Sequence, residues 1–425
     1  MKFLIATIGS RGDVQPYVAL GKGLKAAGHD VTVCTSVRFE AFVAEHGLAY
    51  AYLNDDLLAI LDTVEGQGIF EDMGGLFSGI KTGVRLVKDT GPIQRSLLQE
   101  GWQAAVEVEP DLIVYNSKMG GAPHYADKLG IPVVLAVPFP QFVPTKSFPS
   151  LGFPNWKLGA WYNRATYRIV LAIAERIGGK YVREWRSAHD LPPEPPGADI
   201  LHRSDGSRIP VLHAFSRHVV PEPPDWPEEA ITTGYWFLDR HDEWEPPADL
   251  ERFLKSGDPP VYVGFGSMSG RKPERTARIV TAALQQADLR GVLATGWGGM
   301  KAQAIPSTVF LLDHAPHDWL FPRMSAVVHH GGAGTTAAGL RAGCPTVICP
   351  FFGDQPFWGR RVHDLGLGSA PIPQKKLTAE TLAAALREVT TNHTIRQRAE
   401  EIGEKIRSED GVARAVAVIE NMAGP

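Results

Sequence analysis

Two histidines followed by a run of small residues form the clearest candidate ligand site in this chain. Residues 327–336 read Val-Val-His-His-Gly-Gly-Ala-Gly-Thr-Thr, which predicts a buried strand, a turn and a helix from about Thr335. Free N–H groups and the positive end of the dipole make a helix start a binding site for phosphate. We therefore expect His330, Gly332, Gly334 and Thr335 to hold a phosphate or diphosphate. The alternative is a glycine turn that only packs the helix on the strand.

A carboxylate and a carboxamide stand side by side further along the chain. Asp354 and Gln355 follow the next predicted strand and precede a helix predicted from about Gln355. An aspartate accepts hydrogen bonds, whereas a glutamine both donates and accepts, so the pair suits sugar hydroxyls. The alternative is that Asp354 only caps the helix.

The turn after the first predicted strand contributes a third group. Residues 9–16 read Gly-Ser-Arg-Gly-Asp-Val-Gln-Pro, and Asp13 is a candidate general base, with Ser10 beside it as a candidate acceptor contact. Asp13 is also a candidate helix cap ahead of Pro16, a residue type common at helix starts. Spacing alone leaves both roles open.

Alternating strands and helices would position these groups. The first unit is a strand at 3–8, a helix at about 16–27 and a strand at 30–34, and further strands are predicted at 112–115, 133–137, 261–265, 291–295, 309–312, 326–329 and 346–349. This βα alternation predicts two doubly wound parallel sheets of α/β class that face each other across a cleft. We expect an acceptor domain at 1–220, a proline-rich linker at 221–247, a donor domain at 248–405 and a C-terminal helix at 406–425 that packs back on the first domain.

Composition narrows the classes of function and partner. The formal net charge is −4 over 425 residues, which is too small for a nucleic-acid surface and favours small-molecule ligands. Three cysteines without metal-binding spacing suit a reducing cytoplasm. We expect neither a signal peptide nor a spanning helix, although peripheral membrane contact stays open, and we expect a monomer or a weak homodimer.

Several motifs of metal and cofactor chemistry are missing. The sequence contains no DxD pair, no HExxH and no GxxxxGK[ST]. We therefore expect catalysis without a metal and without a cofactor other than the substrate.

Three segments together resemble one enzyme family. The stretches "GSRGDVQPYVALGKGLKAAGH", "GYWFLD" and "HHGGAGTTAAGLRAGCPTVICPFFGDQPFWG" are similar to family 1 glycosyltransferases, and most to bacterial and fungal sterol glucosyltransferases and antibiotic-tailoring enzymes. The resemblance implies the two-domain GT-B fold, inversion at the anomeric carbon, no metal and a nucleotide-sugar donor, most often UDP-glucose.

The resemblance also implies roles for single residues. His330, Gly334 and Thr335 match the positions that hold the diphosphate. Asp354 and Gln355 match the pair that binds the sugar. Two further positions match: Ser267, a serine beside the phosphates, and Asp13, the proposed base.

The sequence departs from the plant branch of the family where the base and the ribose bind. His314, in the segment His-Ala-Pro-His that ends at His317, replaces a tryptophan that stacks on uracil. Trp297 could supply an aromatic face instead, or it could be a core residue. Ala338 replaces a glutamate that binds the ribose, so uridine and deoxythymidine donors are expected to be poorly distinguished.

The only sequence evidence about the acceptor is a set of apolar residues in two loops. A proline-rich loop carries Phe139 and Phe142, and a glycine-rich segment carries Phe70, Met73 and Phe77. They predict an apolar pocket wall for a sterol, terpenoid, polyketide or flavonoid, with ordinary loop packing as the alternative.

Two other enzyme classes remain as alternatives. A two-domain NAD-dependent dehydrogenase would use the glycine turns, but the first turn lacks the GxGxxG spacing and the second strand ends without an acidic residue. A nucleotide-sugar epimerase, or a binder of nucleotide sugars without catalytic activity, would use the same donor site.

Overall fold

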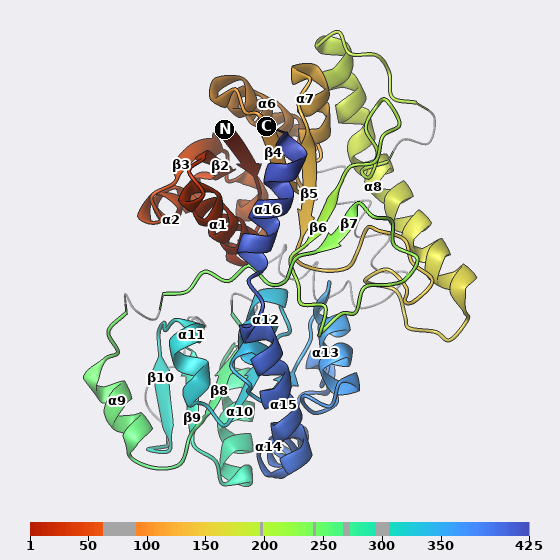
Figure 1. Cartoon of the computed structure of the whole chain (residues 1–425). Helices are drawn as coiled ribbons and strands as arrows, with labels where there is room; N and C mark the ends of the chain where they lie inside the picture. The colour runs from red at the N-terminus through yellow and green to blue at the C-terminus, as the bar shows by residue number, and fades with distance from the viewer. Residues whose placement is uncertain (63–90, 196–198, 241–243, 267–272, 295–305, 425) are drawn as a thin grey trace.

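Two parallel sheets form the framework of the computed structural model (Figure 1), which describes residues 1–62, 91–195, 199–240, 244–266, 273–294 and 306–424. The first sheet has seven strands in the order β3-β2-β1-β4-β5-β6-β7, and the second has five in the order β10-β9-β8-β11-β12. All strand pairs within the two sheets are parallel. The predicted doubly wound α/β architecture is confirmed.

The seven-stranded sheet is built from short runs of β-branched and aliphatic residues. Such runs suit a strand that is covered on both faces, and β4 and β5 are buried along their whole length. The strands are β1 (Lys2–Ala6), β2 (Asp30–Ser36), β3 (Ala49–Leu53), β4 (Leu112–Asn116), β5 (Val133–Val137), β6 (Val211–His213) and β7 (Ala230–Thr232).

Helices cover both faces of this sheet. One core cluster lies under α1 and the other under α6, α7 and α8. The helices are α1 (Arg11–Ala26), α2 (Glu40–Glu45), α3 (Asp56–Asp62), α6 (Gly91–Val108), α7 (Ala122–Leu129) and α8 (Ala160–Ala188).

The five-stranded sheet repeats the plan in the second half of the chain. Its strands are β8 (Val261–Gly264), β9 (Gly291–Ala294), β10 (Val309–Leu312), β11 (Ala326–His329) and β12 (Thr346–Ile348). Its helices are α9 (Ala248–Lys255), α10 (Pro273–Ala287), α11 (His317–Leu320), α12 (Ala333–Arg341), α13 (Gln355–Asp364), α14 (Ala379–Thr391) and α15 (His393–Arg407).

The last helix, α16 (Gly411–Ala423), crosses back to the first domain (Figure 1). Val416 and Ile419 are buried in the same core cluster as α1. A Cβ atom at Gly23 of α1 would lie only 2.3 Å from Cγ1 of Val412, so glycine permits the two helices to approach this closely. The chain therefore begins and ends in one domain.

Three segments differ from the sequence expectations. Helix α1 begins at Arg11 and not near Pro16, because Ser10 and Asp13 form a capping box at its start. The range 221–247, expected as a linker, contains β7, which pairs with β6 at the edge of the first sheet. The 29-residue helix α8 was not predicted.

Candidate active site

The carboxyl ends of β1 and β4 place two charged side chains together. These strands are neighbours at the point where the strand order reverses, which is where open α/β sheets bind ligands. Asp13 follows β1 and Lys118 follows β4, and Lys118 Nζ lies 2.6 Å from Asp13 Oδ1. The other oxygen, Asp13 Oδ2, accepts hydrogen bonds from the backbone N–H of Ser10 at 2.8 Å and from its hydroxyl at 3.1 Å.

The position of Gly9 leaves room for this ion pair. Its φ is +138°, and a Cβ atom there would lie 2.3 Å from Asp13 Oδ2 and 2.7 Å from Lys118 Nζ. Only glycine fits this backbone and this close approach. Asp13 is thus a helix cap, as the alternative interpretation held, and it is also paired with a cation at the ligand-binding edge of the sheet.

Sequence reasoning missed Lys118. The signal that could have found it is its place three residues after the predicted strand 112–115, which neighbours the first strand in a doubly wound sheet.

An apolar pocket opens beside Lys118. The empty space inside it, including space open to solvent, is about 360 Å³. Its wall comes from the turn after β4 and from helices α6, α7 and α8, and none of the predicted acceptor contacts within the described residues belongs to it. The lining residues are Gln94, Leu97, Leu98, Lys118, Met119, Gly120, Gly121, Tyr125, Gly178 and Val182.

The second domain contributes the start of α12. Gly332 is its N-cap, and the backbone N–H of Thr336 donates back to Gly332 O at 2.9 Å, so the preceding N–H groups have no partner within the helix. Gly334 is exposed and Thr335 half-buried. The structure thus brings together Gly332, Gly334 and Thr335, with His330 just before them.

The ring of His330 lies over this helix start. A Cβ atom at Gly332 would lie 2.6 Å from His330 Nε2, so a larger residue there would displace the ring. His330 Nδ1 is buried and has no hydrogen-bond partner among the described residues. Burial lowers the pKa of His330 to about 4, so the imidazole is neutral at pH 7 and carries one N–H donor.

Its neighbour His329 has a different function. The ring is fully buried, and His329 Nδ1 accepts a hydrogen bond from the backbone N–H of Gly331 at 3.0 Å. Burial holds the pKa of His329 well below its usual range. His329 therefore stabilises the turn that places His330.

Asp354 stands at the N-cap position of α13, but its side chain makes no capping hydrogen bond. Asp354 Oδ2 accepts instead from the indole Nε1 of Trp358 at 2.8 Å. Burial raises the pKa of Asp354 to about 6, against the opposing effect of the Trp358 hydrogen bond. The interpretation of Asp354 as a mere cap is therefore not supported by this geometry.

Gln355 is buried and stabilises the turn before α13. Its Oε1 accepts from the backbone N–H of Phe351 at 2.8 Å and of Phe352 at 3.4 Å. The oxygen is thus used within the protein, which leaves the amide N–H₂ as the group able to meet a ligand.

The two domains meet at these groups. The Asp13 carboxylate adds to the raised pKa of Asp354 and the Lys118 ammonium opposes it, so Asp354 lies within electrostatic range of the Asp13–Lys118 pair of the other domain. Helix α1 also contacts α12. The aromatic rings of Phe148 and Phe357, one from each domain, lie 6.2 Å apart.

The two histidines near α11 differ in their surroundings. The side chain of His314 is exposed, but the protein still removes part of its hydration. This partial desolvation lowers the pKa of His314, and the cations Arg11 and Arg240 add to the effect. His317 is stacked on Phe321, with ring centroids 4.2 Å apart, and burial lowers its pKa to about 4. His317 thus packs within its domain, while His314 lies within electrostatic range of Arg11 of the other.

The predicted acceptor contacts are only partly described. Phe142 is 8% exposed and belongs to the core of the first domain, and Phe139 packs against the same cluster. Ordinary packing therefore accounts for Phe142. Predicted residues outside the described part of the chain are Phe70, Met73, Phe77, Ser267 and Trp297.

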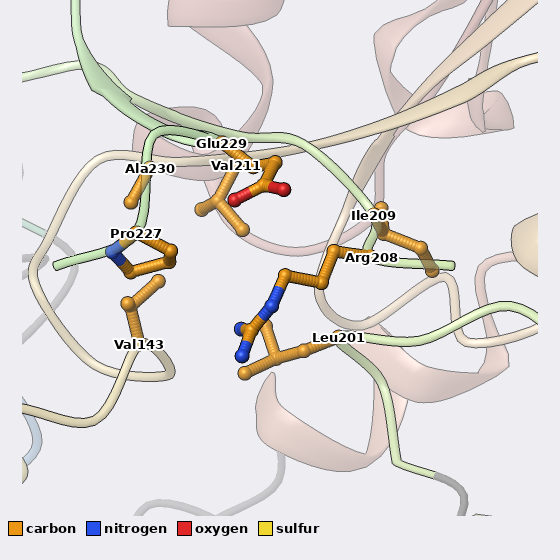
Figure 2. Close-up of a pocket in the computed structure, with 8 residues that line it drawn as sticks. All are labelled: Val143, Leu201, Arg208, Ile209, Val211, Pro227, Glu229 and Ala230. Atoms are coloured by element: carbon orange, nitrogen blue, oxygen red, sulfur yellow. The ribbon is translucent and has the colours of Figure 1, made fainter. Parts of the chain in front are cut away.

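A second hollow lies beside the last strands of the first sheet. Figure 2 shows Arg208 and Glu229 among the side chains that line it. Its empty volume of about 230 Å³ is below the usual range of ligand pockets, and it contains none of the predicted site residues. We assign no ligand to it.

The described residues contain no group of three or more histidine, cysteine or acidic side chains placed to hold a metal ion. Among the helices of these residues, none is both long and apolar enough to cross a membrane.

Both halves of the chain match known sequence families. Residues 3–146 match the family described as glycosyltransferase family 28 N-terminal domain. Residues 280–422 match the family described as erythromycin biosynthesis protein CIII-like, C-terminal domain.

Whole-chain relatives and a solved structure agree with these matches. Sterol 3-beta-glucosyltransferase UGT80A2 of Arabidopsis thaliana is 37% identical over 98% of this chain and 64% of its own length. UGT80B1 of the same plant, another sterol 3-beta-glucosyltransferase, is 35% identical over 98% of this chain and 67% of its own length. The crystal structure of the kitacinnamycin glycosyltransferase superposes with a TM-score of 0.71 at 20% identity and covers 99% of both chains. The chain thus spans about two thirds of these plant relatives.

Proposed function

Because the chain belongs to the family 1 glycosyltransferases of the GT-B fold, we propose that it transfers glucose from UDP-glucose to a hydroxyl of a lipophilic acceptor. The acceptor class that we propose is a sterol. The observation that supports this proposal is the meeting of three groups across the domain boundary. Asp13 and Lys118 come from one domain and Asp354 from the other, and their charges act on each other.

Asp13 would act as the general base. The acceptor oxygen attacks the anomeric carbon, the bond from that carbon to the diphosphate oxygen breaks, and the hydroxyl proton passes to the Asp13 carboxylate. Lys118 and Ser10 each hold one carboxylate oxygen, which fixes the orientation of the base and leaves further lone pairs for the proton.

The start of α12 would hold the diphosphate. Its free N–H groups and the positive end of its dipole stabilise the charge that develops on the leaving group. The neutral ring of His330 adds one N–H donor. Asp354 and the amide of Gln355 would then bind hydroxyls of the sugar, a role supported by the side chain of Asp354 being free of helix capping.

The acceptor would bind at the hollow beside Lys118. Leu97, Leu98, Met119 and Val182 supply an apolar wall, which suits the fused rings of a sterol. The sterol relatives reported above support this choice over a terpenoid, polyketide or flavonoid.

A product assay tests the proposal. The purified protein is incubated with UDP-glucose or dTDP-glucose and a panel of sterols, terpenoids, polyketides and flavonoids. The masses of the products are then measured by mass spectrometry. We expect a gain of one hexose on a sterol and release of UDP that depends on the acceptor. Hexose transfer to another class alone would overturn the sterol assignment.

The two rival classes have their own signals in the same experiment. A dehydrogenase would show the absorbance of reduced nicotinamide, and an epimerase would convert the nucleotide sugar without any acceptor. The relatives reported above are glycosyltransferases and favour neither class.

A further inference from the structure

Helix α8 carries a large apolar surface that nothing in the described chain covers. Trp156 and Leu158 in the preceding loop, together with Trp161, Ile169 and Ile173 on the helix, are between 43% and 69% exposed. The spacing from 161 through 169 and 173 follows one face of an α-helix. Single exposed apolar residues are ordinary, but five within residues 156–173 mark an interaction site. We call these five residues the α8 surface.

The α8 surface is ordered and not a loose loop. Tyr162 is buried between the two tryptophans, with ring centroids 5.7 Å from Trp156 and 6.2 Å from Trp161. Its hydroxyl donates to the backbone oxygen of Pro154 at 2.8 Å. The indoles are therefore held outward by a core contact.

Basic residues border this surface. Lys157, Arg168 and Arg176 are exposed, and no acidic side chain of the described residues pairs with them. The neighbouring acids are already used: Asp225 pairs with Arg164, and Glu175 pairs with Arg183. Tryptophan beside apolar residues and free cations is the composition of helices that lie in the interface of an anionic bilayer.

The same helix also reaches the acceptor pocket. Gly178 and Val182 line that pocket, and Gly178 follows Ile173 by five residues, about 7.5 Å along a helix. In Figure 1, α8 runs along the side of the first domain that faces away from α1 and α2. A lipid-soluble acceptor held in a membrane would thus have a short path to the pocket.

We propose that the α8 surface docks the enzyme on an anionic lipid bilayer, so that the acceptor is taken from the membrane without crossing water. The delivery step rests on the proposed function, whereas the docking step does not. The apolar side chains enter the interfacial region, and the three cations meet the lipid phosphates.

Vesicle sedimentation tests the docking. The full chain is mixed with phosphatidylcholine vesicles that contain or lack phosphatidylserine. The double variant Arg168→Gln/Arg176→Gln should bind the phosphatidylserine vesicles about 25-fold more weakly, or about fivefold per charge. The double variant Trp161→Ser/Ile173→Ser should lose at least about tenfold on both kinds of vesicle.

Matched controls come from other exposed sites. Val106→Ser removes an exposed apolar side chain from α6, and Arg275→Gln/Arg278→Gln removes two exposed charges from α10. Both controls should bind vesicles like the unmodified protein. Equal binding by the α8 variants and the controls would overturn the proposal, as would the absence of any vesicle binding. A surface used for self-association would show instead as a dimer in analytical ultracentrifugation that Trp161→Ser/Ile173→Ser converts to a monomer without effect on vesicles.

A comparison of acceptor delivery separates this proposal from the proposed function. The α8 variants should glucosylate a sterol carried by cyclodextrin at the normal rate, but a sterol in vesicles more slowly. Normal rates with both forms would refute membrane delivery and leave the glucosyltransferase proposal intact. Vesicle docking without any sterol glucosylation would refute only the proposed function.

Discussion

At the scale of single residues, the Asp13 carboxylate combines two tasks that are usually separate. One oxygen caps its own helix and the other pairs with Lys118. Both contacts hold the carboxylate in one orientation. The same contacts that stabilise α1 would therefore orient the base.

Replacing Asp13 by Asn separates these tasks. Asparagine keeps the size and a capping oxygen, so the melting temperature should stay close to that of the unmodified protein. The rate of glucosyl transfer should fall by roughly 100 to 10,000-fold, because the proton acceptor is lost, while UDP binding persists. The control is Asp410→Asn at the N-cap of α16, which makes the same chemical change far from the site. A folded Asp13→Asn enzyme of normal rate would remove Asp13 as the base.

The raised pKa of Asp354 makes the stability of the protein depend on pH. The folded state holds its proton up to about pH 6, against an ordinary value of 3.8, so between these values the folded state binds more protons than the unfolded chain. Stability contributed by this group therefore falls as the pH rises through that window. Asp354→Asn should raise the free energy of unfolding at pH 7.5, on the order of 1–3 kcal/mol, and change it little at pH 4.

Urea unfolding of both proteins at the two pH values measures this difference. UDP should still bind Asp354→Asn, because the carboxylate is proposed to meet sugar hydroxyls and not phosphates. An equal change in stability at both pH values would exclude titration of Asp354 as the cause.

His330 leads to a prediction about donor binding. Because its pKa is about 4, the ring is neutral from pH 7 to pH 8.5, and the UDP dissociation constant should be nearly constant over that range. His330→Ala should weaken UDP binding and slow turnover together, since the N–H donor acts on both the bound and the leaving diphosphate. His393→Ala on α15 is the control. Unchanged UDP affinity in His330→Ala, measured by calorimetry, would contradict the assignment.

At the scale of elements, the first turn of α12 offers a matched pair of glycines. A Cβ atom at Gly332 would collide with the ring of His330, whereas one at Gly334 would meet nothing within 4 Å. Gly332→Ala should lower the melting temperature and weaken UDP binding, because it displaces His330. Gly334→Ala should raise the free energy of unfolding by up to about 1 kcal/mol, because alanine has a higher helix propensity than glycine. It should still weaken UDP binding, because the added methyl group crowds the diphosphate. Calorimetry of both variants decides, and normal UDP binding by both would place the diphosphate elsewhere.

The regular elements were predictable where the pattern was strong. The predicted strands 309–312 and 326–329 agree with the structure. Short runs of β-branched and aliphatic residues between turn residues are typical of buried strands and of few other secondary structures. The start of α1 was missed because Pro16 looked like a first helical residue, whereas the helix begins five residues earlier, at Arg11. β7 was missed because it has only three residues within a proline-rich stretch.

The site could be predicted only where the motif lies within one segment. His330 and Gly332 could be placed together from the sequence because a strand, a turn and a helix follow one another there. Lys118 was not, because 105 residues separate it from Asp13 and only the order of strands in the sheet brings them together. The apolar pocket beside Lys118 draws on four elements and has no local pattern at all.

At the scale of the whole molecule, we propose that the start of α12 stabilises the charge of the leaving diphosphate, which in other enzymes is the function of a bound metal ion. Turnover should therefore survive a chelator, since the leaving diphosphate is met by N–H donors and a helix dipole. An assay with and without EDTA measures this. Complete loss with EDTA, restored by magnesium or manganese, would show that a cation is required.

The return of α16 to the first domain has a consequence for the order in which the protein is made. The ribosome completes residues 1–232, which form every strand of the first sheet, long before the helix that covers α1 has been translated. Domains usually fold as they emerge, the N-terminal one first. Here the apolar side of α1 waits for Val412, Val416 and Ile419, which are translated only after every strand of the second sheet. A chain stalled or truncated before α16 would leave that side open to chaperones and to aggregation, even though its donor domain could be complete.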